Sequence, residues 1–95
     1  METVNGYKIY YKPHEVWNAV TRNHDGVLAE NEYGTQVASW FNERSGKLEL
    51  YYSFDFMYDP VFVGYAKNNE ECEMFVATMY EALFGYKQEE NNERI

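Results

Sequence analysis

The chain is poor in the residues that disulfide-stabilised and metal-binding proteins depend on. Its 95 residues include one cysteine, Cys72, and only two histidines and two prolines. A single cysteine excludes an intrachain disulfide and a thiolate metal cluster within this sequence. The sequence also contains no phosphate-binding glycine loop, nucleophile elbow, zinc motif or calcium loop. We therefore expect no cofactor, no metal and no enzymatic activity.

Long apolar runs and basic residues are scarce as well. Every apolar run is far shorter than the roughly 20 residues that a membrane-spanning helix requires, and the start of the chain carries no secretory leader pattern. Eight bases stand against sixteen acids, which gives a formal net charge of -8. Direct binding to nucleic acid or to an anionic membrane requires the opposite charge. These features predict a cytoplasmic protein without a membrane or nucleic-acid ligand.

The acidic residues are unevenly distributed along the chain. Residues 1–47 hold six acids and five bases, whereas residues 48–86 hold seven acids and one base, a net charge of -6. The last segment, 87–95, adds three acids and two bases. An acidic excess often serves solubility alone. Its concentration in one segment favours a second interpretation, in which an acidic surface binds a basic partner.

The most regular pattern lies in residues 47–56 (KLELYYSFDF). Apolar or aromatic side chains fill every second position: Leu48, Leu50, Tyr52, Phe54 and Phe56. The positions between them hold Glu49, Tyr51, Ser53 and Asp55. Because side chains alternate faces along a strand, this pattern predicts the central strand of an antiparallel sheet, with its apolar face on the core.

The first half of the chain predicts a strand and then a helix. Residues 7–11 (YKIYY) form a compact aromatic and β-branched run that is typical of a strand. Pro13 is well placed to begin a helix that continues through Arg22. Residues 23–26 (NHDG) indicate the end of this helix and a turn. Residues 27–34 are less regular and leave a small strand open as an interpretation.

Residues 35–42 fit two structures. As a helix, they would place Val37, Trp40 and Phe41 on one face; as a strand, they would place Trp40 opposite the other two. The connection NERSG that follows resembles a short hairpin turn with a glycine at its end. We therefore favour a strand that pairs with residues 47–56.

The second half predicts one more strand and a well-defined helix. Asp59 and Pro60 end the preceding run, and residues 61–65 resume the alternation as a shorter strand. Asn68 or Asn69 can cap the helix, and Gly85 can end it. Between these ends, helical spacing connects Cys72, Phe75, Val76, Met79, Tyr80 and Leu83.

The expected element order is therefore β-α-β-β-β-α. A meander of antiparallel strands with helices on one face is an α+β two-layer sandwich. We expect one domain over residues 1–86, followed by a polar, frayed C-terminal tail at 87–95.

Three residues suggest chemistry only weakly. His24 and Asp25 lie together in a turn, but a general base also needs an orienting partner and a pocket. Cys72 falls on the inward stripe of the second helix, where a small buried hydrophobe is the usual role. An enzyme acting through these residues is the least favoured of the three functional hypotheses.

The leading hypothesis is a non-enzymatic inhibitor that covers a basic site on a nucleic-acid-binding protein. Its carboxylates would stand where phosphates lie, since arginine binds both groups in the same forked geometry. The chain resembles, in size, charge and element order, small acidic α+β proteins of phages and mobile elements, including DNA-mimicking inhibitors and some anti-CRISPR proteins. The expected partner-binding residues are Glu49, Tyr51, Asp55, Asp59, Glu70, Glu71 and Glu73.

The alternative hypothesis is a homo-oligomeric structural or scaffold domain, such as a homodimer. It is based on aromatic residues in the nearly neutral N-terminal half, because exposed aromatic side chains are enriched at protein interfaces. The residues expected at this self-interface are Tyr7, Tyr10, Tyr11, Trp17 and Trp40.

Overall fold

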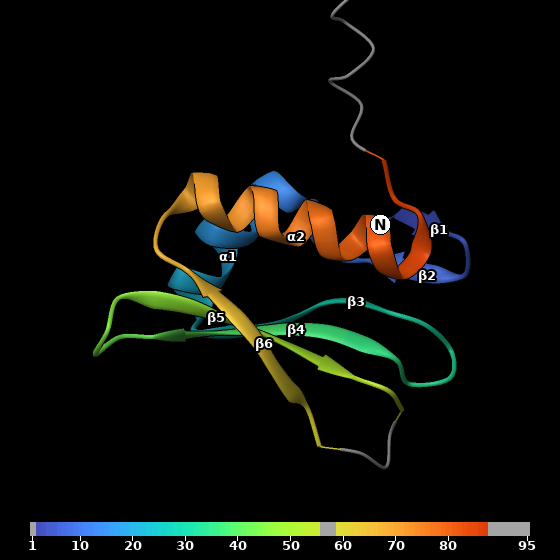
Figure 1. The fold of residues 1–95 in the computed structure, drawn as a ribbon, viewed down its shortest axis with the longest axis horizontal. Helices are drawn as coiled ribbons and strands as arrows, with labels where there is room; N and C mark the ends of the chain where they lie inside the picture. Colours follow the sequence, from blue (N-terminus) through green and yellow to red (C-terminus); the bar gives the residue numbers. More distant parts are fainter. Residues whose placement is uncertain (1, 56–58, 88–95) are drawn as a thin grey trace, which may run out of the picture.

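The computed structural model describes residues 2–55 and 59–87, which form one antiparallel sheet and a helical layer. The elements are β1 (Glu2–Val4), β2 (Tyr7–Ile9), the 3-10 helix η1 (Pro13–Glu15), α1 (Val16–Asn23), β3 (Asp25–Glu30), β4 (Gln36–Asn42), β5 (Lys47–Ser53), β6 (Val61–Ala66) and α2 (Asn69–Phe84). The strands follow one another across the sheet in chain order. Both helices lie on the same side of the sheet (Figure 1). The predicted α+β two-layer sandwich with an antiparallel meander is confirmed.

The sheet contains two strands in addition to the four that were expected, β1 and β3. β1 pairs with β2 through a tight turn at Asn5 and Gly6, which both have positive φ angles, as an Asn-Gly hairpin turn requires. β3 begins at Asp25, directly after helix α1. The turn predicted over residues 23–26 is therefore shorter than expected. His24 alone connects the helix to the strand, and its φ of 76° changes the direction of the chain. Asp25 and Gly26 belong to the strand.

The β4–β5 hairpin confirms the strand interpretation of residues 35–42. Its register runs without interruption from Gln36 opposite Ser53 to Asn42 opposite Lys47. The Asn42 side chain accepts hydrogen bonds from the backbone N–H groups of Arg44 and Ser45 and so holds the turn. β5 lies between β4 and the edge strand β6, so it is an interior strand but not the middle one.

The alternation of β5 is confirmed over only part of its predicted length. Leu48 and Leu50 are fully buried, and Tyr52 is half-buried. The strand ends at Ser53, where the chain bends, and Phe54 is 60% exposed with its ring against that of Tyr52. The prediction that Phe54 continues the buried face is wrong because the bend interrupts the strand. Phe56 lies outside the described residues.

Helix α2 supplies the largest part of the helical side of the core. Its ends are as predicted, since Asn68 accepts a hydrogen bond from the N–H of Glu71 and Gly85 adopts the left-handed conformation. Tyr80 is completely buried, and its hydroxyl donates toward the carbonyl oxygens of Tyr11 and Leu28. The helix buries Cys72, Val76, Met79, Tyr80 and Phe84.

The C-terminal boundary of the domain stays a prediction. Tyr86 is buried against Tyr80, which ties the chain after α2 to the core. Of the expected polar tail, residues 88–95 lie outside the described residues. None of the helices that the structure describes has the length and apolar character needed to cross a membrane.

Candidate protein-binding face

The sheet has one face that no described helix or strand covers, and we call it the open face. The helices pack on the other side, where Leu48 and Leu50 of β5 are buried (Figure 1). Because strand side chains alternate between faces, the residues between these two leucines and their cross-strand neighbours point away from the helices. The open face is therefore built by β3 to β6 from residues that contribute little to the core.

Four side chains cross the open face in a single row. Asp25 lies opposite Trp40, Trp40 opposite Glu49, and Glu49 opposite Tyr65, so that β3, β4, β5 and β6 each supply one member. Adjacent strands are about 4.8 Å apart. Two carboxylates thus alternate with two aromatic rings, and Trp40 and Tyr65 are 44% and 47% exposed. We call these four residues the Trp40 row.

A second, apolar row lies beside the first. Val27 of β3 is opposite Ala38 of β4, which is opposite Tyr51 of β5, which is opposite Phe62 of β6. The rings of Tyr51 and Phe62 meet edge to face with centroids 5.7 Å apart. Phe62 is 51% exposed. The open face therefore combines exposed aromatic surface with fixed negative charge.

Glu49 and Tyr51, both predicted from the alternation of β5, are in direct contact. The Tyr51 hydroxyl donates a 2.6 Å hydrogen bond to Glu49 Oε1, and the Asn42 amide donates to Oε2 at 3.2 Å. The bond to the carboxylate is the main cause that raises the pKa of Tyr51, because it stabilises the protonated phenol. The Glu49 carboxylate is thereby held in one orientation on the sheet.

The structure reveals a second carboxylate held in the same way. Glu30 of β3 accepts a hydrogen bond from the Tyr10 hydroxyl on one oxygen and from the Gln36 amide on the other. The hydrogen bond from Tyr10, followed by that from Gln36, lowers the pKa of Glu30. Glu30 was not predictable from the sequence because a register shift between Val27 and Ala29 breaks the alternation of β3.

The other predicted binding residues belong to none of the strands that build the open face. Asp55 and Asp59 flank residues 56–58, which lie outside the described residues. The first turns of α2 carry Glu70, Glu71 and Glu73, in the layer on the opposite side of the sheet. Glu71 accepts a hydrogen bond from the backbone N–H of Lys67, so it caps its own helix. The structure thus brings Glu49 and Tyr51 together, whereas the five other predicted acids lie in α2 or outside the helices and strands.

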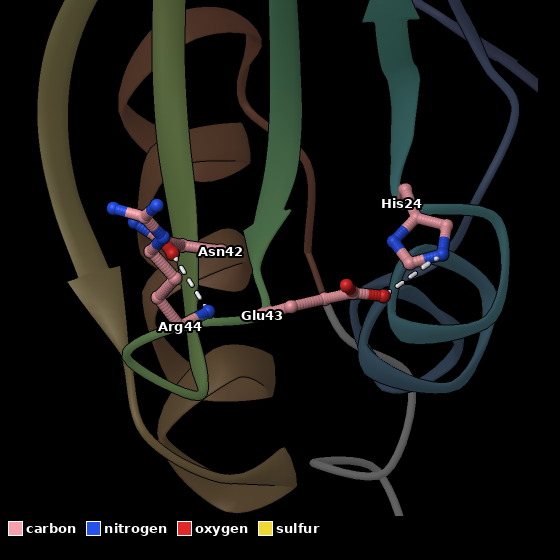
Figure 2. Close-up of polar contacts among 4 residues, drawn as sticks. All are labelled: His24, Asn42, Glu43 and Arg44. Carbon is pink, nitrogen blue, oxygen red and sulfur yellow. Dashed lines mark hydrogen bonds and ion pairs between the residues drawn. The ribbon is translucent and has the colours of Figure 1, made fainter.

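Of the residues suggested for catalysis, His24 and Asp25 adjoin each other where α1 meets β3, and Cys72 belongs to α2. His24 ends α1 and contacts the Glu43 carboxylate of the β4–β5 turn, with 3.2 Å between Nε2 and Oε2 (Figure 2). Asp25 belongs to the Trp40 row. Cys72 is fully buried, and burial is the main cause that raises the pKa of its thiol to about 12. A buried thiol that stays protonated at neutral pH is a weak nucleophile.

The aromatic residues expected at a self-interface are divided between core and surface. Tyr7 stacks on Phe84 with centroids 4.4 Å apart, and Trp17 packs edge to face against Phe41. Tyr11 also packs against the core. The two exposed members of the set are Tyr10 and Trp40. Trp40 belongs to the open face, and Tyr10 contacts Glu30 of β3 through its hydroxyl.

Comparison with known proteins adds no functional assignment. No protein-family model, no curated protein and no solved structure matches the chain. Among the described residues, no three histidine, cysteine, aspartate or glutamate side chains gather as ligands for a metal ion. The chemistry of the open face is therefore what points to a function.

Proposed function

We propose that this protein is a small, acidic, non-enzymatic binding protein that acts in the cytoplasm. It places its open face on a basic site of a partner protein, of the type that otherwise binds nucleic acid. One observation carries the proposal: the Glu49 carboxylate, fixed by the Tyr51 hydroxyl, lies on a sheet face that no described element covers. The net charge of -8 makes a basic partner the complementary one.

The fixed carboxylates suit this role because they need little ordering when a partner binds. Glu49 and Glu30 are each held by a tyrosine hydroxyl and by a side-chain amide. Immobilising a flexible side chain at an interface costs about 0.5–1.5 kcal/mol, and a preorganised side chain avoids most of that cost. Arginine side chains that grip phosphates can bind such carboxylates in the same forked geometry.

The acids outside the open face contribute at longer range. Residues 48–86 carry a net charge of -6, to which Asp55, Asp59 and the glutamates of α2 belong. A field of one sign accelerates the encounter with an oppositely charged partner and weakens as salt is added. We assign these acids to steering and the open face to contact. The biological setting is an anti-defence inhibitor of the phage DNA-mimic or anti-CRISPR kind.

Affinity capture tests the proposal. The purified protein serves as bait in a nuclease-treated lysate, and bound proteins are released first by salt and then by duplex DNA. We expect a nucleic-acid-binding protein that DNA displaces. The double variant E30Q/E49Q should lose it, because both fixed charges are gone.

The control removes a charge from the other layer. Glu81 lies on α2, where it pairs with Lys87 at 3.7 Å, and E81Q should retain the captured protein. Equal capture by the wild type and by E30Q/E49Q would contradict the proposal. Capture that duplex DNA does not disturb would also contradict it, because the covered site would then not be a nucleic-acid site.

A homodimer formed through the open face is the second candidate. The exposure of Trp40, Phe62 and Tyr65 on one face favours it. Two copies of this face would, however, bring their own fixed carboxylates together, and like charges across an interface are unfavourable. Sedimentation equilibrium over a range of protein concentrations distinguishes the two. A dimer that W40S dissociates would support this second candidate over the first.

A further inference from the structure

We propose that the Trp40 row is an arginine-binding site. The guanidinium of a partner arginine stacks on the Trp40 indole and donates hydrogen bonds to the carboxylates of Asp25 and Glu49. The inference rests on the proposed function and deepens it, because it names the side chain of the partner that the open face recognises. It also makes Trp40 and Asp25, which charge alone does not single out, the residues that determine specificity.

The order of side chains in the row places an aromatic ring between two acids. Asp25 and Glu49 are the direct cross-strand neighbours of Trp40 on its two sides. Two strand spacings separate the backbones of these acids by roughly 10 Å, and the indole lies between them. A guanidinium is planar and presents five N–H donors around its edge. Lying flat on the indole, it can donate toward both sides at once.

Both carboxylates can accept further hydrogen bonds. An ionised carboxylate offers about four acceptor positions. Glu49 uses one on each oxygen, for Tyr51 and for Asn42. Asp25 is exposed, and its carboxylate makes no hydrogen bond or ion pair with any residue that the structure describes. A guanidinium can therefore bind without displacing the internal contacts that orient Glu49.

A cation already lies over one aromatic ring of the row. The Lys47 ammonium lies 4.3 Å from the centroid of the Tyr65 ring, within the distance of a cation–π interaction. Tyr65 is the other neighbour of Glu49. An aromatic ring beside Glu49 thus attracts a cation within the protein itself. Lys47 covers the Tyr65 ring. The Trp40 indole, which is the stronger cation–π partner, stays exposed to a ligand.

Arginine fits this arrangement better than lysine. The lysine ammonium is a compact, strongly hydrated charge that cannot stack and cannot reach two carboxylates on opposite sides of a ring. A guanidinium is more weakly hydrated and stacks on aromatic faces. The row should therefore distinguish two peptides of equal charge, which a diffuse acidic surface would not do.

Peptide titration followed by NMR tests the inference. The probes are tetra-arginine and tetra-lysine, and the signals are the indole N–H resonances of Trp40 and Trp17, assigned with W40F. We expect tetra-arginine to shift the Trp40 resonance and to bind roughly three- to fivefold more tightly than tetra-lysine, the size of an exposed cation–π contact. The Trp17 resonance should not move, because Trp17 packs against Phe41 on the helix side.

Variants separate recognition by the row from simple charge attraction. D25N and W40A should each bind tetra-arginine and tetra-lysine with about equal affinity. E43Q, which removes one charge from the β4–β5 turn, should keep the preference for tetra-arginine. K47Q frees the Tyr65 ring and should strengthen tetra-arginine binding about twofold. Far-UV circular dichroism verifies that each variant is folded, and D25N provides the test if W40A is not.

The outcomes distinguish this inference from the proposed function. If the two peptides bind equally and E30Q/E49Q abolishes both, the arginine site is wrong while an acidic binding face stands. If neither peptide binds or moves the Trp40 resonance, the arginine site is also wrong. If arginine preference is present but no DNA-displaceable protein is captured, the proposed function is wrong and the arginine site stands.

Discussion

The ring of Phe75 on helix α2 lies directly over Gly64 of the edge strand β6. A Cβ atom at position 64 would lie 2.7 Å from Cε2 and 2.8 Å from Cζ of that ring. Gly64 is opposite Leu50 in the sheet register, on the side that the helices cover. β6 therefore approaches α2 this closely because residue 64 has no side chain.

We predict that G64A destabilises the protein by about 1–3 kcal/mol, the usual cost of overpacking. Urea denaturation measures the change. The matched control is G26A, because Gly26 also lies in a strand and its added Cβ would meet its nearest neighbours at 3.8 and 3.9 Å, an ordinary contact. That control should be neutral or stabilising. F75L should restore part of the stability of G64A, and equal losses in the two glycine variants would refute the packing argument.

At Ser39 we predict that a substitution raises the stability of the protein. It is buried on the helix side of β4, and its hydroxyl has no hydrogen-bond partner among the residues that the structure describes. Leaving a buried polar group unsatisfied costs about 1–3 kcal/mol. We therefore expect S39A to raise the free energy of unfolding by about 1 kcal/mol. A loss of stability in thermal and urea denaturation would show instead that the hydroxyl has a partner.

The sequence was sufficient to predict the parts of the fold that depend on local periodicity. Leu48 and Leu50 alternate because β5 has a strand on each side and helices on one face. The stripe of α2 and its caps at Asn68 and Gly85 are equally local. β1 could not be predicted in this way, since its three residues form a strand only through their pairing with β2. The irregularity of β3 similarly reflects its pairing with β4.

The candidate site was predictable only in part, for the same reason. Glu49 and Tyr51 follow from alternation within one strand. The Trp40 row requires the register of four strands at once, and no single stretch of sequence contains that register. Glu49 was predicted to share one surface with the glutamates of α2 because these acids are close along the chain. The fold places α2 in the other layer.

Asn5 connects the first hairpin to the last helix, and its amide is the basis of the third prediction. Its Nδ2 donates a 2.6 Å hydrogen bond to the carbonyl oxygen of Phe84, at the C-terminal end of α2. N5D replaces this donor with a carboxylate beside a carbonyl oxygen and beside the negative end of the helix dipole. Because aspartate tolerates the positive φ of this turn as asparagine does, we expect a loss of about 1–2 kcal/mol from the contact itself.

The same substitution at the other end of a helix provides the control. Asn18 is exposed in the first turn of α1, where the dipole favours a negative charge. N18D should therefore be neutral or slightly stabilising in the same thermal denaturation experiment. Equal destabilisation by N5D and N18D would mean that added negative charge, and not the lost hydrogen bond to Phe84, determines the effect.

The last prediction concerns Cys72 and alkaline pH. Burial, with a smaller contribution from the charge of Glu73, raises the pKa of the thiol from its ordinary 9.0 to about 12 in the folded state. Above pH 9 the unfolded chain therefore loses a proton that the folded protein keeps, and the free energy of unfolding falls as the pH rises. The loss attributable to Cys72 is up to about 1.4 kcal/mol per pH unit between pH 9 and 12.

Denaturation of the wild type and of C72A at a series of pH values measures this contribution. Burial also raises the pKa of Tyr80 well above its ordinary 10.0, with a smaller contribution from Cys72 itself. The burial contribution is present in both proteins and cancels in the difference. The cavity left by C72A lowers stability by an amount that does not depend on pH. We therefore expect the stability advantage of the wild type to be constant below about pH 8 and to shrink steadily above pH 9. A difference that stays constant to pH 11 would mean that the folded protein gives up the Cys72 proton as readily as the unfolded chain, and the thiol would then be reactive in the native state.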